Sequence, residues 1–397
     1  MKQSEKNAAA IADWLKNQSI VTKVIYPGLP EHPGYEIMKK QARGFGSMLT
    51  FYVDTKEHAL AILEKVKMIQ FAESLGGVET LITYPATQTH ADVPEESWFV
   101  KTPGVVFALA MAVKAYTTPG DAVLVQQPVY YPFSEVITDN GRKLVSSDLI
   151  LLEDNRYHID FEDFERKVKE SRIKLFLLCS PHNPAGRVWT KEELIRLGDI
   201  CLKYGVIVVS DEIHHDFIFK GEHHVFASLK KEYEDIAVIC TSPSKTFNLA
   251  SMLVSNFFIP NKELRSQFRK QADAAGISQL SILGLTAAQA AYQDGEEWYQ
   301  AVTVYIKGNI EFVKEYTKQK LKNVRAVDTE GTYLVCLDFR KTGMDEEELD
   351  RKLLYDAKLW LDSGKIFGSA GKGFQRINAA CPRAVLEEAL CRIQGIC

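Results

Sequence analysis

Short runs of entirely apolar residues alternate with amphipathic stretches from about residue 100 onward. The runs are residues 122–125, 175–178, 206–209 and 236–240. Each has the length of one buried strand, whereas residues 104–116 place Val105, Leu109 and Ala112 on one face of a helix. Fully apolar strands that alternate with helices predict an α/β fold, in which a mainly parallel sheet is covered on both faces.

The two ends of the chain have different patterns. Residues 278–321 are mainly helical with a break near Asp294, and a small α+β unit follows, with a strand at 332–339 and a last helix at 382–393. The start of the chain predicts a helix at 8–14, strands at 21–26 and 48–53, and a helix at 56–66. We therefore expect three domains, residues 1–94, 95–290 and 291–397.

Composition excludes several classes of protein. Of the 397 residues, 46% are hydrophobic and 25% are charged, as in globular proteins, and the net charge of −4 offers no basic surface for nucleic acid. No apolar run approaches the roughly 20 residues of a membrane span, and no signal peptide is evident. The seven cysteines are scattered without a CxxC motif, which predicts reduced thiols and a cytoplasmic protein.

Lys245 is the first candidate for chemistry, because it follows the apolar run 236–240 among small hydroxyl residues. Burying an ammonium without a partner is costly, so such a lysine often forms a Schiff base with an aldehyde cofactor. Ser242 and Ser244 then hold the phosphate of that cofactor. The alternative is a solvated lysine in a turn.

Asp211 ends the preceding apolar run, 34 residues before Lys245. That spacing permits a parallel crossover, which brings both residues to one sheet edge. A carboxylate there can keep a pyridine nitrogen protonated, although helix caps and surface acids are common at strand ends.

Three further candidates also follow apolar runs. Asn183 lies in SPHNPAG (180–186), where its amide can bind a phenolic oxygen, although Asn-Pro and Gly are also routine in turns. In PVYYPF (128–133), Tyr130 or Tyr131 can stack on a planar cofactor while the other hydroxyl assists proton transfer. The alternative is that both are core or rim tyrosines.

The last candidates lie near the two ends of the α/β region. Val105 and Val106 open a helix, whose free N–H groups suit a phosphate, unless they are simply capped. Arg376 can hold a substrate carboxylate with two hydrogen bonds or form a surface salt bridge. His214 and His215 are adjacent and point opposite ways on a strand, so we expect no metal site.

These motifs, in this order, resemble the cystathionine β-lyase and cystalysin group of C–S lyases over about residues 97–397. Those are pyridoxal phosphate (PLP) enzymes of the aspartate aminotransferase fold, PLP fold type I. The matching stretches are TPGVV (102–106), PVYYPF (128–133), SPHNPAGRVW (180–189), SDEIH (210–214), TSPSKTFN (241–248), EGTYL (330–334) and GFQRINAACPR (373–383). The resemblance implies PLP as cofactor, a small amino-acid substrate and a homodimer with shared sites.

The resemblance also assigns a role to each candidate residue. It makes Lys245 the Schiff-base lysine, Asp211 the partner of the pyridine nitrogen, and Arg376 the holder of the substrate carboxylate. The remaining candidates surround the cofactor: Asn183 on its phenolic oxygen with His214 nearby, Tyr130 on its ring, Tyr131 in proton transfer, and Val105, Val106, Ser242 and Ser244 at its phosphate. The lyases usually have a glycine at the position of Ser251, whose side chain is expected to crowd the cofactor loop.

Residues 5–94 depart from that group. They lack its entrance segment and the tyrosine that reaches the partner subunit's phosphate. They resemble instead the C-terminal domain of the cystathionine γ-synthase and γ-lyase enzymes, in VIYPGLPEHPGYE (24–36), GFGSMLTF (44–51) and AESLGGVETLITYPATQTHADVP (72–94). This second resemblance places Ser74 and Leu75 at a substrate site, and the catalytic domain of that group is absent.

The expected function is a PLP-dependent β-eliminating C–S lyase, which acts on cystathionine or a related cysteine conjugate. Lys245 would remove the α-proton, the thiolate would leave, and pyruvate and ammonia would follow. Two rivals stay open at this point. One is an aminotransferase that uses the same cofactor residues, and the other is a PLP-binding regulatory protein with little or no activity.

Overall fold

The computed structural model of this protein describes residues 2–67, 69–71, 81–82, 99–277 and 279–397. Contacts between residues divide the chain into two compact units, 1–96 and 97–397. The boundary predicted at about residue 94 lies outside the described residues, as do Ser74 and Leu75.

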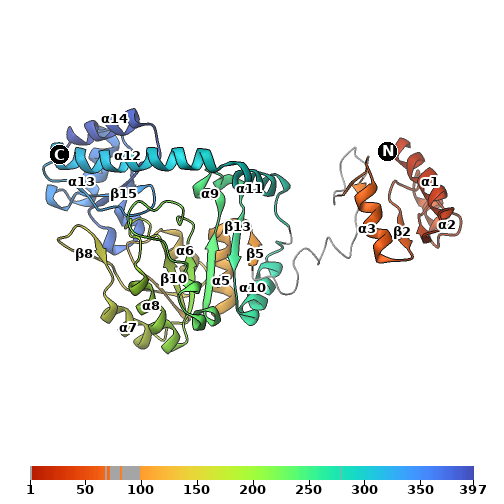
Figure 1. Ribbon diagram of the computed structural model, residues 1–397, viewed down its shortest axis with the longest axis horizontal. Helices are drawn as coiled ribbons and strands as arrows, with labels where there is room; N and C mark the ends of the chain where they lie inside the picture. The colour runs from red at the N-terminus through yellow and green to blue at the C-terminus, as the bar shows by residue number, and fades with distance from the viewer. Residues whose placement is uncertain (1, 68, 72–80, 83–98, 278) are drawn as a thin grey trace. The chain divides into compact units, whose positions relative to one another are not determined.

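The first unit is a small α+β structure (Figure 1). Its elements are α1 (Lys2–Lys16), β1 (Val21–Ile25), α2 (Tyr35–Gln41), β2 (Thr50–Val53), α3 (Lys56–Lys65), β3 (Gln70–Phe71) and β4 (Leu81–Ile82). Strands β1 and β2 pair antiparallel, and β3 pairs with β4 in parallel. Within the described residues, Ala8, Ala12, Tyr26 and Leu29 form a small buried cluster in this unit. The two helices and two strands predicted here are confirmed, with α1 starting six residues earlier than expected.

A seven-stranded sheet forms the centre of the second unit, in the order β5-β13-β12-β11-β10-β6-β7. Its strands are β5 (Phe99–Thr102), β6 (Ala122–Val125), β7 (Lys143–Ser146), β10 (Leu175–Cys179), β11 (Ile207–Asp211), β12 (Ala237–Thr241) and β13 (Ser255–Phe258). All neighbouring strands from β7 to β12 pair in parallel, and β13 pairs antiparallel with both β12 and β5. The four apolar runs are thus the inner parallel strands β6, β10, β11 and β12, as predicted. Strands β5, β7 and β13 were not predicted from the sequence.

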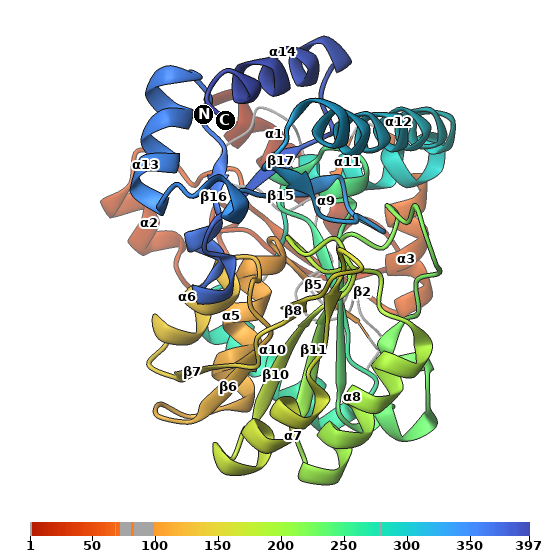
Figure 2. The same ribbon diagram turned by 90° about the vertical axis from the view of Figure 1, so that its left-hand side faces the viewer.

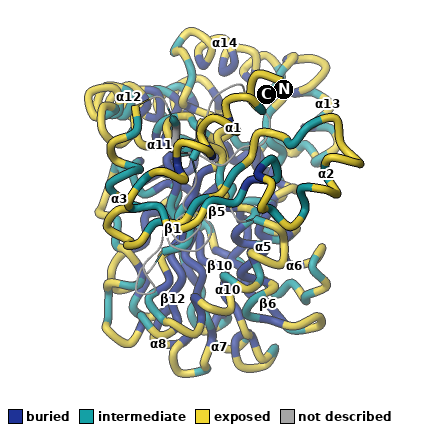
Figure 3. Tube along the Cα trace, turned by 90° about the vertical axis from the view of Figure 1, so that its right-hand side faces the viewer, coloured by how far each residue is buried: buried dark blue, intermediate teal, exposed yellow. Residues whose placement is uncertain are grey.

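Successive residues of these strands face opposite layers of helices. Leu175 and Leu177 pack in one core with α5 (Val105–Tyr116), α6 (Pro132–Thr138) and α10 (Lys262–Ala274). Phe176 and Leu178 pack in the other core with α7 (Phe161–Glu170) and α8 (Lys191–Tyr204). Figure 3 shows β10 and β12 as buried strands inside these layers. Because both faces are covered, every residue of β6 and β10 is buried and apolar.

A second, four-stranded sheet lies beyond the carboxyl ends of the parallel strands (Figure 2). Its strands are β14 (Arg325–Ala326), β15 (Leu334–Asp338), β17 (Phe374–Asn378) and β16 (Asp362–Ser363), in that order and all antiparallel. It packs with the long helix α12 (Glu296–Lys320) and with α14 (Arg383–Gln394) around its own core. The predicted helical break is confirmed at Gly295, between α11 (Ile282–Asp294) and α12.

Short elements complete the second unit. They are the hairpin β8 (Ile150–Leu151) and β9 (Tyr157–His158), α9 (Pro243–Thr246), α13 (Glu346–Arg351), a π-helical turn (Lys352–Asp356), and 3₁₀ turns at Phe226–Ser228, Lys231–Asp235, Ala250–Met252, Arg340–Thr342, Gly364–Phe367 and Ser369–Gly371. The domain boundary predicted at residue 290 falls inside α11, and it stays a prediction. Among the described residues, no helix is long and apolar enough to cross a membrane.

Gly198 of α8 provides a test of this packing. A Cβ at this position would lie 2.4 Å from Cζ of Tyr233, whose ring is fully buried and whose hydroxyl donates to the Ile195 carbonyl at 2.8 Å. We expect Gly198→Ala to lower the free energy of unfolding by about 1–3 kcal/mol. Urea denaturation followed by circular dichroism measures this change.

Gly308 of α12 is the matched control. Its nearest neighbour to an added Cβ is the end of the flexible Arg383 side chain, at 3.5 Å. Gly308→Ala should therefore raise stability by about 0.5–1 kcal/mol, as is usual inside a helix. Equal effects of the two substitutions would contradict the tight contact between α8 and Tyr233.

Candidate active site

Asp211 and Lys245 lie at the carboxyl edge of the large sheet. Asp211 is the last residue of β11, level with Cys179 of β10 and Cys240 of β12. Lys245 lies in α9, which begins two residues after β12 ends. The prediction that a parallel crossover brings the two strand ends together is confirmed. Short apolar β-strands cannot accommodate such charges within the layers, so both groups emerge where the strands stop.

Burial controls the charge of both groups. Burial raises the pKa of Asp211 to about 7, against a hydrogen bond from the Ile213 amide and the charge of Lys245. Burial also lowers the pKa of Lys245, and the charge of Arg376 lowers it further, while Asp211 opposes the shift. Within the described residues, neither the Asp211 carboxylate nor the Lys245 amine takes part in an ion pair at contact distance. The edge therefore holds an acid and a base that each lack a direct ionic partner.

Arg376 reaches this edge from the second sheet. It lies on β17, and its Nη1 donates to Oδ1 of Asn183 at 2.7 Å. Asn183 follows β10 and is buried, with its carbonyl accepting from the Tyr130 amide at 2.9 Å. Because Oδ1 of Asn183 faces Arg376, its Nδ2 group is left as a donor for another molecule. The structure thus brings together residues 193 positions apart.

Three rings lie near these polar groups. The Tyr130 and Tyr131 rings are 5.2 Å apart, and burial together with Tyr131 and Asp211 raises the pKa of Tyr130. His214 is 3% exposed, and burial lowers its pKa to about 3, so its ring is neutral near pH 7. The His214 and Tyr333 ring centroids are 5.6 Å apart in an edge-to-face arrangement. The Nδ1 atom of His214 is buried with no hydrogen-bond partner among the described residues.

The residues predicted to hold a phosphate lie at two helix starts. Gly104 precedes α5 with φ 95°, and none of the described side chains caps the α5 amides, so the start of this helix, at Val105 and Val106, has donors for a ligand. Ser242 caps α9 by accepting from the Ser244 amide at 3.1 Å, and its hydroxyl donates to the Val254 carbonyl at 2.6 Å.

The expected crowding of the cofactor loop by Ser251 stays a prediction. Ser251 lies in the turn Ala250–Met252, and it is exposed. Its φ lies outside the left-handed region, in which Asn248 and Leu253 are found nearby. A serine therefore adopts this backbone conformation without the freedom of a glycine.

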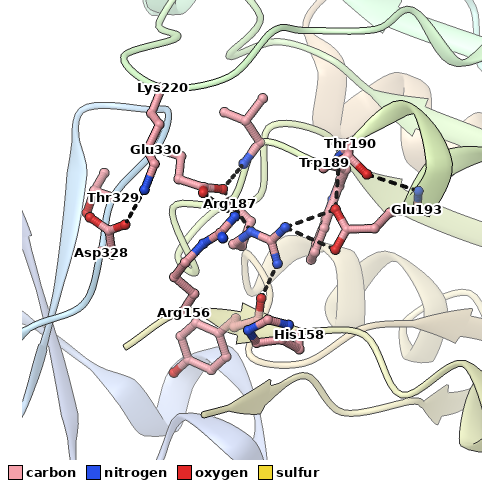
Figure 4. A network of polar contacts seen from close by, with 12 residues as sticks. Arg156, His158, Arg187, Trp189, Thr190, Glu193, Lys220, Asp328, Thr329 and Glu330 are labelled. Atoms are coloured by element: carbon pink, nitrogen blue, oxygen red, sulfur yellow. Dashed lines mark hydrogen bonds and ion pairs between the residues drawn. The ribbon is translucent and has the colours of Figure 1, made fainter. Parts of the chain in front are cut away.

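A buried ionic network joins the loop of Asn183 to the second sheet (Figure 4). Arg187 is 1% exposed; its Nε donates to Glu330 at 2.8 Å, and its Nη2 donates to Glu193 at 2.9 Å. Glu330 also pairs with Arg156. The backbone adds to this link, because the Glu330 amide donates to the Gly186 carbonyl at 2.7 Å. Every member is paired, which is the condition under which buried charges are tolerated.

Sequence reasoning did not find four residues that shape this site. Arg187 and Glu330 lie inside the matching motifs SPHNPAGRVW and EGTYL, but nothing marked them as a pair. Tyr333 contacts His214, and Asp362 binds Arg376 with Nε to Oδ2 at 3.1 Å. Arg187 and Glu330 are 143 residues apart, and the Asp362 contact depends on the register of β16 against β17, so no local pattern could have indicated them.

Comparison with known proteins shows which family the chain belongs to. Residues 88–393 match the family described as aminotransferase class I and II. The chain belongs to this family. It is 42% identical to cystathionine β-lyase PatB of Bacillus subtilis (strain 168) over 303 residues, which cover 76% of the chain and 78% of that relative. Residues 1–106 match a different family, the Cys/Met metabolism PLP-dependent enzymes. Both resemblances proposed from the sequence are therefore confirmed.

Solved structures agree with this assignment. Cystalysin from Treponema denticola, which contains a PLP cofactor, has a TM-score of 0.73 and 39% identity, with 75% of this chain and 76% of that chain covered. A PLP-bound C–S lyase from Staphylococcus hominis has a TM-score of 0.71 and 28% identity, with 91% and 87% covered. PLP fold type I, predicted for this region, is thereby confirmed.

The groups at the sheet edge fit PLP. Lys245 supplies an amine without an ionic partner for an aldehyde, and Asp211 supplies a buried carboxyl for a protonated ring nitrogen. The uncapped start of α5 supplies N–H donors for a phosphate, and Nδ2 of Asn183 is a donor for a phenolic oxygen. Among the described residues, no cluster of three or more His, Cys, Asp and Glu side chains is arranged to hold a metal ion.

The raised pKa of Asp211 has a measurable consequence in cofactor-free protein. A carboxyl whose pKa rises from 3.8 to about 7 on folding favours the folded state while it is protonated. The stability from this group is thus complete below about pH 4 and is lost as the pH rises toward 7. Asp211→Asn keeps the shape without the charge, so its stability should fall less across this range. Urea denaturation at several pH values tests this, and parallel stability curves would contradict it.

Proposed function

We propose that this protein is a PLP-dependent C–S β-lyase, which cleaves cystathionine or a related cysteine conjugate to a thiol, pyruvate and ammonia. The observation that carries the proposal is the convergence at one sheet edge of Lys245, Asp211 and Arg376. The identity to cystathionine β-lyase PatB and the likeness to two PLP-containing structures, cystalysin and a C–S lyase, support the same reaction class.

The site residues divide the work of binding the cofactor and the substrate. Lys245 holds the PLP aldehyde, Asp211 keeps the ring nitrogen protonated, and Tyr130 stacks on the ring. Asn183 binds the phenolic oxygen, with His214 close to it. Val105, Val106, Ser242 and Ser244 surround the phosphate. Arg376 binds the substrate carboxylate through charge-assisted hydrogen bonds.

Bound PLP supplies an electron-accepting ring that stabilises negative charge at the substrate Cα. The substrate amine would take the place of Lys245 on the PLP aldehyde, which would free the Lys245 amine. The lowered pKa of Lys245 favours its neutral form, which would accept the proton from Cα. Arg376 orients the substrate by its carboxylate, so that this proton faces Lys245. Asp211 holds a proton at the ring nitrogen. The Cβ–S bond then breaks, the thiolate takes up a proton, and one water completes the conversion to pyruvate and ammonia. Tyr131 assists proton transfer.

The test of this function is turnover together with cofactor binding. Purified protein loaded with PLP should show an absorbance band of bound cofactor and release pyruvate from L-cystathionine, as measured with lactate dehydrogenase. Lys245→Ala should lose that band and lower turnover by about 100-fold or more, because the amine is the proton acceptor. Lys203→Ala is the control, since Lys203 lies on the exposed face of α8 in an ion pair with Glu165.

Other outcomes identify the rival functions. Consumption of a keto acid without pyruvate release would show an aminotransferase. A cofactor band without any turnover would show a PLP-binding protein with a regulatory role. Absorbance unchanged by Lys245→Ala would contradict the placement of the cofactor.

We further infer that two copies of the chain pair through an apolar patch beside the phosphate end of the site. The patch consists of Val106, Met252, Leu253, Ile282 and Leu283, with exposed fractions from 39% to 73%. Its members are neighbours, because Leu253 lies against Gly104 and the Met252 carbonyl lies against Gly284. Exposed apolar groups that gather in this way are typical of an interface.

The unpaired state of all seven cysteines supports a cytoplasmic location.

The dimer is tested by sedimentation equilibrium. The wild-type protein should have twice the chain mass of 44.8 kDa, and Leu253→Asp should shift it toward the monomer, because a buried charge opposes association. Val385→Asp is the control, since Val385 is also exposed but lies on α14. A wild-type monomer with full activity would rule out the shared site.

A further inference from the structure

Three side chains of the protein hold Arg376 in place. Strands β16 and β17 pair so that Asp362 stands directly opposite Arg376. Oδ2 of Asp362 accepts from both Nε, at 3.1 Å, and Nη2, at 2.5 Å. Oδ1 of Asn183 accepts from Nη1 at 2.7 Å. The ring of Phe367 lies 4.7 Å below the guanidinium, which adds a cation–π contact. The orientation of Arg376 is thus set by contacts at Nε and Nη2, at Nη1, and on the face of the guanidinium.

The remaining donors of Arg376 suit a carboxylate. A guanidinium has five N–H groups, and the contacts above use the one on Nε, one on Nη1 and one on Nη2. Within the described part of the chain, one N–H on each terminal nitrogen is left. Two such donors on neighbouring nitrogens are what a carboxylate needs for a bidentate contact. Asp362 occupies Nε and one N–H of Nη2, and the second N–H of Nη2 is left for a ligand.

The geometry points to Asp362 as a positioning residue for recognition of the substrate carboxylate, an inference that rests on the function proposed above. Its place opposite Arg376 is fixed by the backbone pairing of β16 and β17, so the ion pair needs little further ordering. Arg376 is 11% exposed whereas Asp362 is 46% exposed. The arginine is therefore the buried, binding member of the pair, and the aspartate supports it from the solvent side.

Asp362→Asn is the variant that tests this role. It removes the charge and keeps one acceptor oxygen, and the exposure of Asp362 favours a folded variant. We expect KM for L-cystathionine to rise about 10-fold or more while kcat changes less than about 2-fold, because the carboxylate contact is uniform binding energy. Asp362→Glu, which restores the charge, should recover part of the loss.

A pair of small ligands separates positioning from general damage. On PLP-loaded protein, the change in cofactor absorbance gives Kd for L-methionine, which has no leaving group at Cβ, and for 3-(methylthio)propylamine, which lacks the carboxylate. Asp362→Asn should weaken the amino acid about 10-fold and leave the amine unchanged. Asp350→Asn is the matched control, because Asp350 accepts from Gln375, the neighbour of Arg376 on β17, at 2.8 Å. We expect it to change neither ligand.

Three results would overturn the inference. An unchanged affinity for the amino acid would show that Asp362 does not position Arg376. A tighter affinity would show that Asp362 instead competes with the substrate carboxylate. Equal weakening of both ligands would show a general structural role. Because these binding measurements need no turnover, a wild-type protein without lyase activity would refute the proposed function and still leave Asp362 tested.

Discussion

The ion pair between Arg187 and Glu330 is the interaction on which the site depends most. It is buried, and it joins the loop after β10 to the loop before β15. Asn183 lies on the first of these loops, and the second leads to the strand paired with β17, which carries Arg376. A buried carboxylate between two arginines cannot lose a partner cheaply. The network therefore fixes the distance between the cofactor side and the substrate side of the site.

The chemistry of the site depends on the burial of Asp211 and Lys245 away from water. Asp211 and Lys245 stand where parallel strands end, which gives them access to a ligand but little solvent. Burial shifts both pKa values toward the neutral forms. The lowered pKa favours the neutral form of the Lys245 amine, which can accept a proton. The buried Asp211 carboxylate in turn favours a protonated ring nitrogen beside it. The same desolvation thus prepares both residues for one cofactor.

Much of the second unit could be predicted from the sequence, and the limits have physical reasons. The buried parallel strands β6, β10, β11 and β12 are continuous apolar runs, so they were visible locally. The edge strands β5 and β7 and the reversed strand β13 mix polar and apolar residues and were missed. Arg376 was recognised through its motif, but its partner Asp362 depends on the pairing of β16 with β17. The ion pair of Arg187 with Glu330 spans 143 residues, and such contacts are properties of the fold.

The central claim is that Lys245 is the residue that holds the cofactor. Reduction of the PLP-loaded protein with borohydride makes the link between an amine and the PLP aldehyde permanent, and peptide mass spectrometry then locates it. The account predicts the added pyridoxyl phosphate mass on the peptide that contains Lys245 and on no other peptide. A label on a different lysine, or none after full loading with PLP, would contradict it.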